Sequence, residues 1–325
     1  MHNTLGESGK PVIILRFGFC LPHDGPLSAP FNMTELSRHA ERIGFDTLVE
    51  PSDHIVMPEK ISTTYPYSSS GKYTDTPEDL DQLTTLSFVA AKTEEIRVMT
   101  GISVIPYRNP LALANAFATV DYLSDGRLDI GAGVGWMKEE FDLLRVPFLE
   151  RGEIMDESIK ILKIIWSEKN PEFSGKYFRF KDAHFSPKVV QKPHPPIWIG
   201  GESPRALRRA AELGDGWLPI DNNETFPLLT LEQMSNAIGR LRARIVKAGR
   251  KVEDVQVGYV PQILEMSDHP SSTGLLSGDT GTIAKNVGEL EELGVSFIAL
   301  SFLRENLDKT KDYSKKFAEE VIDRL

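Results

Sequence analysis

The stretch 127–136 has the spacing that most directly suggests ligand chemistry. A short apolar run, 128–130, predicts a buried strand, and glycines alternate with other residues directly after it. Because glycine has no Cβ, the backbone at Gly133 and Gly135 can lie flat against a planar ligand. The dinucleotide fingerprint G-x-G-x-x-G is excluded, because Trp136 occupies the place of its third glycine. On local sequence alone, a strand-to-helix turn with an exposed Trp136 is an equally good interpretation.

A second candidate site begins at Gly200. Gly200-Gly201-Glu202-Ser203 follows a short apolar strand and precedes a helix that opens with Pro204. Proline suits the first position of a helix, where the free main-chain N–H groups and the helix dipole favour an anion. This segment therefore predicts a phosphate site, with a simple capped helix as the alternative.

A third candidate is the pair Asp53-His54, which follows the predicted strand 47–49. Histidine titrates near neutral pH, so His54 is a candidate for proton transfer, with Asp53 placing it. His23, at the end of the first predicted strand, is the competing candidate. A solvated or structural histidine is the alternative interpretation for either.

The elements that must position these residues form a repeating pattern. Three helix ends are followed by a glycine and a buried strand, at Gly44, Gly214 and Gly294, and each glycine suits the left-handed position after a helix. Eight strands are predicted in all, with helices between them: 15–19, 47–49, 97–105, 128–130, 197–199, 217–220, 255–260 and 296–301. The predicted fold class is α/β, a (β/α)8 TIM barrel with insertions after strands 2, 4 and 7, in which ligands bind at the carboxyl ends of the strands.

Two helix starts and two loops follow from the same pattern. Asn109 and Pro110 predict a helix start, and Asn32 predicts another, with its helix running from 33 to 43. The turn-rich segments 55–77 and 267–281 follow strands 2 and 7, so we expect them to be mobile rims over the barrel mouth.

Length and composition set outer bounds. The 325 residues include 37 Lys and Arg and 47 Asp and Glu, a net charge of −10 that argues against nucleic-acid binding. The only cysteine, Cys20, rules out a disulfide within the chain and fits a reducing, cytoplasmic location. No apolar run approaches the roughly 20 residues needed to span a membrane. The histidines form no H-x-x-x-H pair, so no metal site is expected.

The motifs together resemble the luciferase-like monooxygenase superfamily, in particular its branch of coenzyme F420-dependent oxidoreductases. The matching pieces are collinear: Ser52-Asp53-His54, the segments 100–106, 123–136, 150–152 and 195–201, and Gly214-Asp215-Gly216-Trp217. The resemblance implies one barrel domain over residues 1–325 and a flavin or deazaflavin ring in the barrel mouth.

The resemblance also implies positions for the site. It places a non-proline cis peptide and a ring-supporting bulge at Gly101-Ile102-Ser103, and a cofactor phosphate at Gly200–Ser203. Gly133, Gly135 and Trp136 would lie beside the cofactor, and Asp53 and His54 beside its reactive carbon. Deazaflavin sugar-phosphate dehydrogenases of the superfamily carry a glutamate where this chain has Trp136, which argues for an apolar or aromatic substrate instead.

The leading hypothesis is an oxidoreductase that transfers a hydride between coenzyme F420 and a small organic substrate. The alternative is an FMN-dependent, two-component monooxygenase that receives reduced flavin from a partner reductase and uses O2. A ligand-binding barrel without catalysis is a third possibility, and a hydrolase barrel lacks the paired carboxylates that it would need at strand ends. The superfamily further suggests a homodimer.

Overall fold

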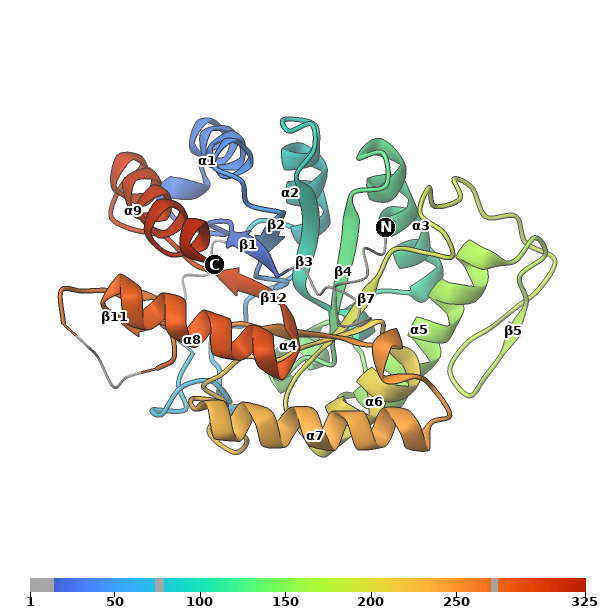
Figure 1. Ribbon diagram of the computed structural model, residues 1–325. Helices are drawn as coiled ribbons and strands as arrows, with labels where there is room; N and C mark the ends of the chain where they lie inside the picture. The colour runs from blue at the N-terminus through green and yellow to red at the C-terminus, as the bar shows by residue number, and fades with distance from the viewer. Residues whose placement is uncertain (1–14, 74–78, 270–273) are drawn as a thin grey trace.

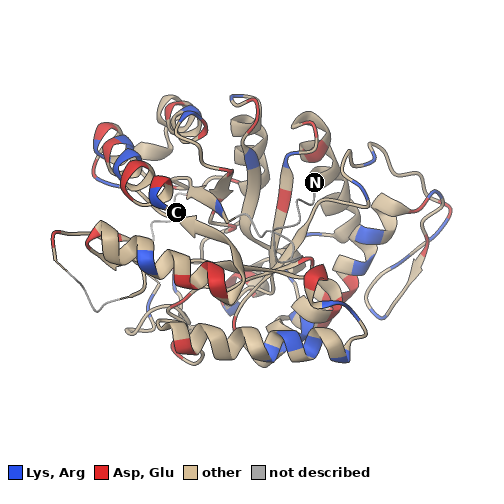
Figure 2. Cartoon of the chain, in the orientation of Figure 1, with Lys and Arg blue, Asp and Glu red and all other residues tan. Residues whose placement is uncertain are grey.

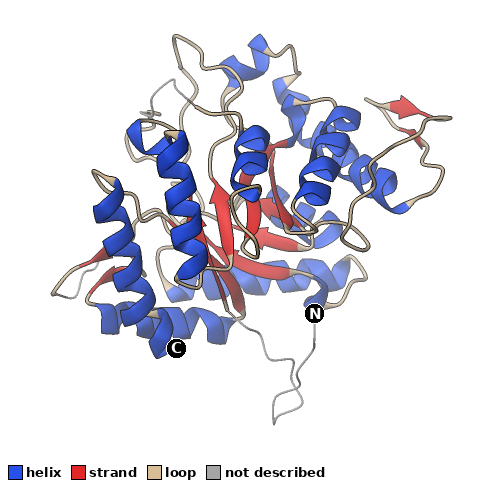
Figure 3. Ribbon diagram, turned by 90° about the horizontal axis from the view of Figure 1, so that it is seen from above, coloured by secondary structure: helices blue, strands red, loops and turns tan. Residues whose placement is uncertain are grey.

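A closed barrel of eight parallel strands forms the centre of the protein, and the helices surround it (Figures 1 and 3). The computed structural model describes residues 15–73, 79–269 and 274–325. The strands follow one another around the barrel in the order β1-β12-β9-β8-β7-β4-β3-β2. Their bounds are β1 Arg16–Cys20, β2 Thr47–Glu50, β3 Arg97–Val104, β4 Leu128–Gly133, β7 Ile197–Gly200, β8 Gly216–Leu218, β9 Gln256–Tyr259 and β12 Val295–Leu300. The predicted TIM barrel is therefore confirmed, with all eight predicted strands in the barrel.

Nine α-helices are found in the described residues: α1 Pro30–Arg42, α2 Gln82–Ala90, α3 Pro110–Leu123, α4 Lys138–Leu143, α5 Arg151–Ser167, α6 Pro204–Leu213, α7 Leu231–Lys247, α8 Thr280–Leu293 and α9 Leu307–Glu320. As predicted, Asn109 caps α3 by accepting a hydrogen bond from the N–H of Leu111. The predicted cap at Asn32 is wrong, because α1 already begins at Pro30, which takes the first helical position.

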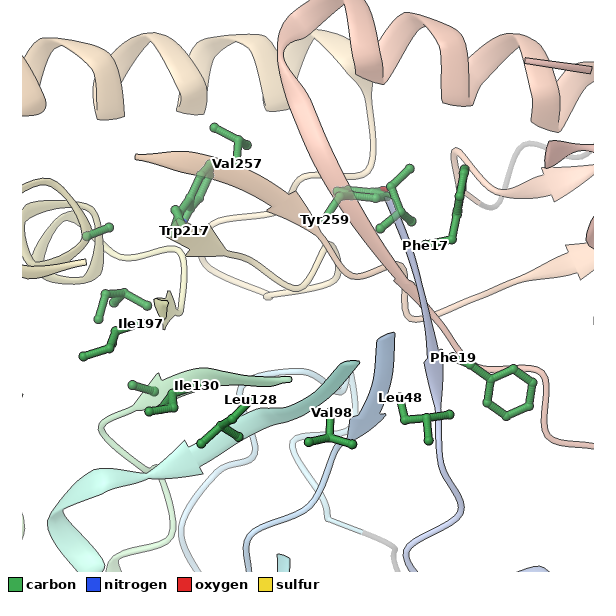
Figure 4. Close-up of a cluster of buried hydrophobic side chains, with 14 of the residues drawn as sticks. Phe17, Phe19, Leu48, Val98, Leu128, Ile130, Ile197, Trp217, Val257 and Tyr259 are labelled. Atoms are coloured by element: carbon green, nitrogen blue, oxygen red, sulfur yellow. The ribbon is translucent and has the colours of Figure 1, made fainter. Parts of the chain in front are cut away.

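Alternating side chains explain why these strands close into a barrel. Phe17, Phe19 and Leu48 point outward into the layer between strands and helices, together with the other residues labelled in Figure 4. Their neighbours point inward, where Val49 and Trp198 belong to a separate inner cluster. Strands buried on both faces are apolar at successive positions, as parallel sheets require.

The insertions occur where they were expected. The connection after β2 runs from 51 to 81, the one after β4 contains α4, and the one after β9 contains the short strands β10 Glu265–Met266 and β11 Ser277–Gly278. A further hairpin, β5 Phe173–Ser174 with β6 Arg179–Phe180, lies between α5 and β7 and projects from the barrel (Figure 1). Parts of the two expected rims, 74–77 and 270–273, lie outside the described residues. That the whole chain forms one domain stays a prediction.

Two of the three helix-end glycines adopt the predicted left-handed conformation. Gly44 has φ 86° and Gly294 has φ 99°. Gly214 has φ −87°, so the prediction is wrong there. A Cβ at Gly214 would lie 2.8 Å from the Cγ1 of Ile199 and 3.0 Å from the carbonyl oxygen of Gly216. Close packing between α6 and the next strand, rather than backbone conformation, therefore requires glycine at this position.

Candidate active site at the carboxyl end of the barrel

Strand β3 carries an irregularity at the barrel mouth. Its pairing with β4 shifts register between Thr100 and Ser103, and the peptide bond between Gly101 and Ile102 is cis, as the motif resemblance predicts. The carbonyl oxygen of Ile102 accepts a hydrogen bond of 3.3 Å from the side-chain amide of Gln82. The bulge thus turns Ile102 into the mouth of the barrel.

Glycines of β4 and β7 surround this isoleucine, although a Cβ at Gly131 would first meet the carbonyl oxygen of Thr100, at 2.1 Å. A Cβ at Gly133 would lie 2.2 Å from the Cδ1 of Ile102, and one at Gly131 or Gly200 would lie 3.2 or 3.0 Å from its Cγ2. Of the two glycines expected to face a planar ligand, Gly133 therefore faces Ile102, whereas a Cβ at Gly135 would lie 2.7 Å from the Cγ1 of Val104. A flat ligand in the mouth would rest on the Ile102 side chain.

The carboxylate of Asp53 forms a salt bridge with Arg108. Its two carboxylate oxygens accept hydrogen bonds of 2.7 and 2.8 Å from the guanidinium of Arg108, and one of them also accepts from the hydroxyl of Ser103 (3.1 Å) and the N–H of Val104 (2.6 Å). Burial raises the pKa of Asp53, while Arg108 opposes that rise. This network ties the end of β2 to the bulge of β3, so Asp53 does not place His54.

Glu140 takes that role. Its carboxylate lies 2.8 Å from the Nδ1 of His54, and it also accepts from the hydroxyl of Tyr107 (2.9 Å) and the N–H of Ile55 (2.7 Å). Burial lowers the pKa of His54, but the hydrogen bond and charge of Glu140, together with the charges of Asp79 and Asp53, outweigh it, and the pKa ends above its usual value. An imidazole whose Nδ1 proton is directed at a fixed carboxylate has its Nε2 available for proton transfer.

Trp136 forms one wall of the site together with two tyrosines. Its ring centroid lies 4.9 Å from that of Tyr65 and 5.3 Å from that of Tyr73, and the ring of His54 lies 5.1 Å from Tyr73 and 6.4 Å from Trp136. Trp136 is half-buried rather than an exposed turn residue. The candidate proton-transfer residue thus borders an aromatic surface.

The middle of the connection after β2 is held at two points by residues that follow other strands. At the first point, the carboxylate of Glu139 accepts hydrogen bonds from the N–H and hydroxyl groups of Ser62 and Thr63, at 2.5–3.0 Å. At the second, the carbonyl of Tyr67 accepts from the side-chain amide of Asn222 (2.8 Å), and that of Pro66 accepts from the N–H of Glu224 (3.1 Å). In Figure 1 this pale-blue segment lies beside the first turn of α7. The described part of the connection therefore covers the site in this conformation; its mobility stays a prediction.

The start of α6 has the predicted geometry. Ser203 caps the helix by accepting a hydrogen bond from the N–H of Ala206, Pro204 takes the first helical position, and Gly201 has φ 96°. The carboxyl of Glu202 is held by groups outside α6: it accepts hydrogen bonds from the N–H of Ile220 (2.8 Å) and the hydroxyl of Tyr67 (3.1 Å). Of the predicted cradle, Glu202 therefore offers only its main-chain N–H.

Two arginines reinforce the positive potential at this helix start. Arg151 opens α5 and donates to the carbonyl oxygens of Gly135 (3.1 Å) and Phe148 (2.8 Å), and to no carboxylate among the described residues. Burial lowers the pKa of Arg151, and the nearby charges of Arg205 and Arg209 lower it further. Arg209 is paired with Asp156, whereas Arg205 is exposed and forms no ion pair within the described chain. Arginines that repel one another at a helix start are complementary to an anion.

A cleft of about 450 Å³ continues from this helix start between α6 and α7. Arg240 and Arg244 line it on the α7 side, with Asn236 and Gln233 beside them, and Pro204 lines it on the α6 side. Figure 2 shows that Lys and Arg gather along the C-terminal half of α7. Neither arginine is paired with a carboxylate in the described residues, so the cleft extends the positive region away from the barrel mouth.

The structure brings most of the predicted site residues to one end of the barrel. His54, Trp136 and the bulge at Gly101–Ser103 lie at the mouth, and Gly200–Ser203 forms the helix start beside it. Sequence reasoning missed Glu140, Arg108, Arg151 and Arg205. A motif signal existed for Arg151 in the matching segment 150–152, but none marked Glu140, which comes seven residues after the last residue of β4 on a short helix.

Comparisons with known proteins agree with this arrangement. The profile of the luciferase-like monooxygenase family matches residues 15–268. An uncharacterized protein of Mycobacterium tuberculosis is 29% identical over 209 residues, which cover 63% of this chain and 73% of that protein. The FMNH(2)-dependent dimethylsulfone monooxygenase of Pseudomonas putida is 29% identical over 222 residues, 67% of this chain and 54% of that protein. The oxygenase component of the flavin-dependent trigonelline monooxygenase of Acinetobacter baylyi is 33% identical over 129 residues, 39% of this chain and 35% of that protein.

Solved structures show the same fold at low sequence identity. The coenzyme F420-dependent tetrahydromethanopterin reductase of Methanopyrus kandleri has a TM-score of 0.74 and 18% identity, over 96% of this chain and 99% of that one. An F420-dependent secondary alcohol dehydrogenase in complex with an F420-acetone adduct has a TM-score of 0.73 and 16% identity, over 95% of this chain and 99% of that one. In the described residues, no helix is long and apolar enough to cross a membrane.

Proposed function

Because this chain belongs to the luciferase-like monooxygenase family of oxidoreductases, we propose that it transfers a hydride between coenzyme F420 and a small organic substrate. The observation that carries this choice of coenzyme is the arginine-lined cleft between α6 and α7. F420 carries an anionic lactyl-oligoglutamate chain beyond its phosphate, whereas FMN ends at the phosphate. A phosphate at the start of α6 would direct such a chain toward Arg240 and Arg244.

The residues at the site are complementary to both the phosphate and the ring of the coenzyme. The main-chain N–H groups of Gly201–Ser203, with Arg151 and Arg205, are complementary to the phosphate, and the Ile102 side chain offers an apolar platform for the ring. When bound, the deazaflavin ring supplies the carbon that accepts or donates the hydride.

The chain itself would supply the proton transfer. His54 can give a proton to a substrate oxygen, or take one from it, through Nε2 while Glu140 holds Nδ1. The raised pKa keeps a larger share of His54 protonated near neutral pH than an ordinary histidine would have, and Glu140 stabilises that charged form. Tyr107 and the N–H of Ile55 fix the carboxylate, so the imidazole keeps one orientation.

The walls of the site favour an apolar or aromatic substrate. Trp136, Tyr65 and Tyr73 present ring faces next to His54, and aromatic rings pack well on such faces. The three rings contact one another directly in this conformation. A substrate would therefore enter when the covering segment 55–73 moves away from the mouth.

Parallel titrations of the protein with F420 and FMN test the choice of coenzyme. We expect F420 to bind more tightly, and the double variant Arg240→Gln/Arg244→Gln to weaken F420 binding roughly 3- to 10-fold, as the loss of two exposed charge contacts implies, while FMN binding stays unchanged. Arg242→Gln is the matched control, because Arg242 lies on the same helix but donates to the carbonyl of Leu293. FMN binding equal to or tighter than F420 binding would contradict the proposal.

The second candidate is an FMN-dependent monooxygenase that uses O2 and receives reduced flavin from a partner reductase. The names of the Pseudomonas and Acinetobacter relatives support it, since one is FMNH(2)-dependent and the other is an oxygenase component. Oxidation of an aromatic substrate that requires O2, this protein and a flavin reductase supplied with FMN and NADH would favour this alternative.

We also propose that the protein acts as a homodimer, as the superfamily resemblance suggests. Sedimentation equilibrium at micromolar concentration measures the mass directly. A mass of 36.3 kDa, that of one chain, would contradict the dimer.

A further inference from the structure

One acidic residue lies within the proposed phosphate cradle. Glu202 is the middle residue of Gly201–Ser203, the segment that leads into α6, and it is 4% exposed. Free N–H groups at a helix start, here with Arg151 and Arg205 nearby, are complementary to an anion, so a carboxylate among them opposes binding of the ligand. The carboxyl can lie no farther from the cradle than the length of one side chain. Its charge therefore affects any anion that binds there.

The carboxyl of Glu202 is held between the barrel and the covering segment 55–73. One oxygen accepts a hydrogen bond from the N–H of Ile220, beyond the end of β8 (2.8 Å), and the other accepts from the hydroxyl of Tyr67 in the covering segment (3.1 Å). Both donors are neutral groups, so neither compensates a negative charge. A buried carboxylate without a cation is unfavourable, whereas the neutral acid with the same hydrogen bonds is not.

The other charged groups around Glu202 leave it without a counter-ion. The charged residues on the surrounding elements are Arg151 of α5, Arg205 of α6, Asp221 and Glu224 after β8, and Arg240 and Arg244 of α7. None of the four arginines forms an ion pair with Glu202 within the described chain. Asp221 and Glu224 add negative charge, and Tyr67 stays protonated because burial and the charge of Glu202 raise its pKa well above the usual value. A proton, rather than a cation of the chain, therefore neutralises Glu202.

That proton is exchanged near neutral pH. Burial raises the pKa of Glu202 to about 7, and the hydrogen bonds from Ile220 and Tyr67 offset only part of the rise. At pH 7 the carboxyl is therefore neutral in about half of the molecules. An anion in the cradle raises the pKa further, because like charges oppose ionisation. Binding of an anion beside Glu202 thus favours uptake of a proton from solvent.

We propose that Glu202 selects for the singly charged phosphodiester of coenzyme F420 over the doubly charged phosphomonoester of FMN. The proposal rests on the proposed phosphate site at the start of α6. The phosphate of F420 bears one charge, because the lactyl chain is attached to it, whereas the terminal phosphate of FMN carries about 1.5 to 2 charges at neutral pH. Repulsion by a carboxylate grows in proportion to the charge of the ligand. Above neutral pH, where Glu202 is ionised, FMN therefore meets the stronger repulsion.

Titrations of the full chain with FMN and with F420, at pH 6 and at pH 8, test this selection. At pH 8 the wild type can escape the repulsion by taking up a proton, which limits the loss of affinity to about tenfold. Glu202→Gln removes the charge and keeps the shape of the neutral acid. We expect the variant to bind FMN about 3- to 10-fold more tightly than the wild type at pH 8, and F420 at most about 2-fold more tightly.

The comparison at pH 6 shows whether charge is the cause. There the wild-type carboxyl is already neutral, so wild type and Glu202→Gln should bind each ligand equally, within about twofold. Comparing the two proteins at the same pH cancels the titration of the phosphate of FMN itself. A gain in affinity cannot arise from damage to the fold. Equal gains for FMN and F420 at pH 8, or no gain for FMN, would overturn the proposal.

Tyr67→Phe is a second variant that acts on the same carboxyl from the covering segment. It keeps the ring but removes the hydroxyl that stabilises the ionised form of Glu202, so FMN binding should begin to weaken at a higher pH than in the wild type. An unchanged pH dependence would contradict the proposal. Glu224→Gln is the matched control: Glu224 is exposed in the loop after β8, only its main-chain N–H bonds to Pro66, and neither affinity should change.

These outcomes are separate from the choice of coenzyme. If FMN binds the wild type more tightly than F420, the proposed coenzyme is wrong, yet a gain for FMN in Glu202→Gln at pH 8 and not at pH 6 still identifies Glu202 as the group that opposes a doubly charged phosphate. If F420 binds more tightly and Glu202→Gln changes neither affinity, the coenzyme stands and Glu202 does not select it.

Discussion

Glu202 is expected to make the stability of the protein depend on pH. This carboxyl is 4% exposed, accepts hydrogen bonds from the N–H of Ile220 and the hydroxyl of Tyr67, and has no cationic partner in the described structure. Burial raises its pKa from 4.5 to about 7, although both hydrogen bonds oppose the rise. The folded protein therefore binds this proton more tightly than the unfolded chain does.

The sign and size of the effect follow from that difference. A raised pKa stabilises the folded state fully below about pH 4.5, and this contribution is lost as the pH rises through about 7. At about 1.4 kcal/mol for each pH unit, the loss amounts to about 3 kcal/mol. Glu202→Gln removes the titration but keeps the size of the side chain and an oxygen that accepts from Ile220. The variant should therefore lose about 3 kcal/mol less stability than the wild type over this range.

Urea unfolding at intervals between pH 5 and 8 measures the difference. The control is Glu232→Gln, which removes an exposed carboxylate from the first turn of α7. Its profile should run parallel to that of the wild type, whereas the Glu202→Gln profile should diverge from it as the pH rises. Parallel profiles for Glu202→Gln and wild type would show that Glu202 titrates normally in the folded state, and the argument from burial would then be wrong.

Three further outcomes follow from the site. His54→Ala should reduce turnover by about 10²–10⁴-fold and leave the Kd of the coenzyme within a few-fold; full turnover in His54→Ala with loss in His23→Ala would assign the proton transfer to His23. Ser203→Asp places a negative charge at the start of α6 and should weaken coenzyme binding clearly in a fluorescence titration; an unchanged Kd would place the phosphate elsewhere. Glu139→Gln weakens the contacts that hold Ser62 and should speed proteolysis of the segment 55–73. If the wild-type segment is cleaved equally fast with and without coenzyme, it does not close over the site as a lid.

The barrel was predictable because its signals are local. Apolar runs at regular spacing, each followed by a helix pattern, identify strands without knowledge of their partners. Asn109 with Pro110 and Ser203 with Pro204 mark helix starts through hydrogen bonds that a few residues decide. Gly214 shows the limit of such reasoning. Its neighbours resemble those of Gly44, but its φ is negative, and close packing against Ile199 on another element is what requires glycine there.

The site was predictable only where motifs mark it. The bulge at Gly101–Ser103 and the helix start at Gly200–Ser203 are continuous segments, so their sequence carries their geometry. The partner of His54 is different, because Glu140 is 86 positions away on a helix that the strand pattern does not predict. Asp53 was the plausible partner from adjacency, but neighbours at a strand end point in different directions, and Arg108 captures Asp53 instead.

Glu50 did give a signal in the sequence, which is an acid at the end of an otherwise apolar strand. Charged residues are almost never fully buried without a partner, so a glutamate after Thr47-Leu48-Val49 is more naturally taken as the point where the strand leaves the core. The structure continues β2 through Glu50 by pairing it with Thr100, and this pairing holds the carboxyl under the barrel mouth. Backbone pairing thus imposes the burial, and burial in turn raises the pKa of the Glu50 carboxyl well above its usual value, which favours its neutral form.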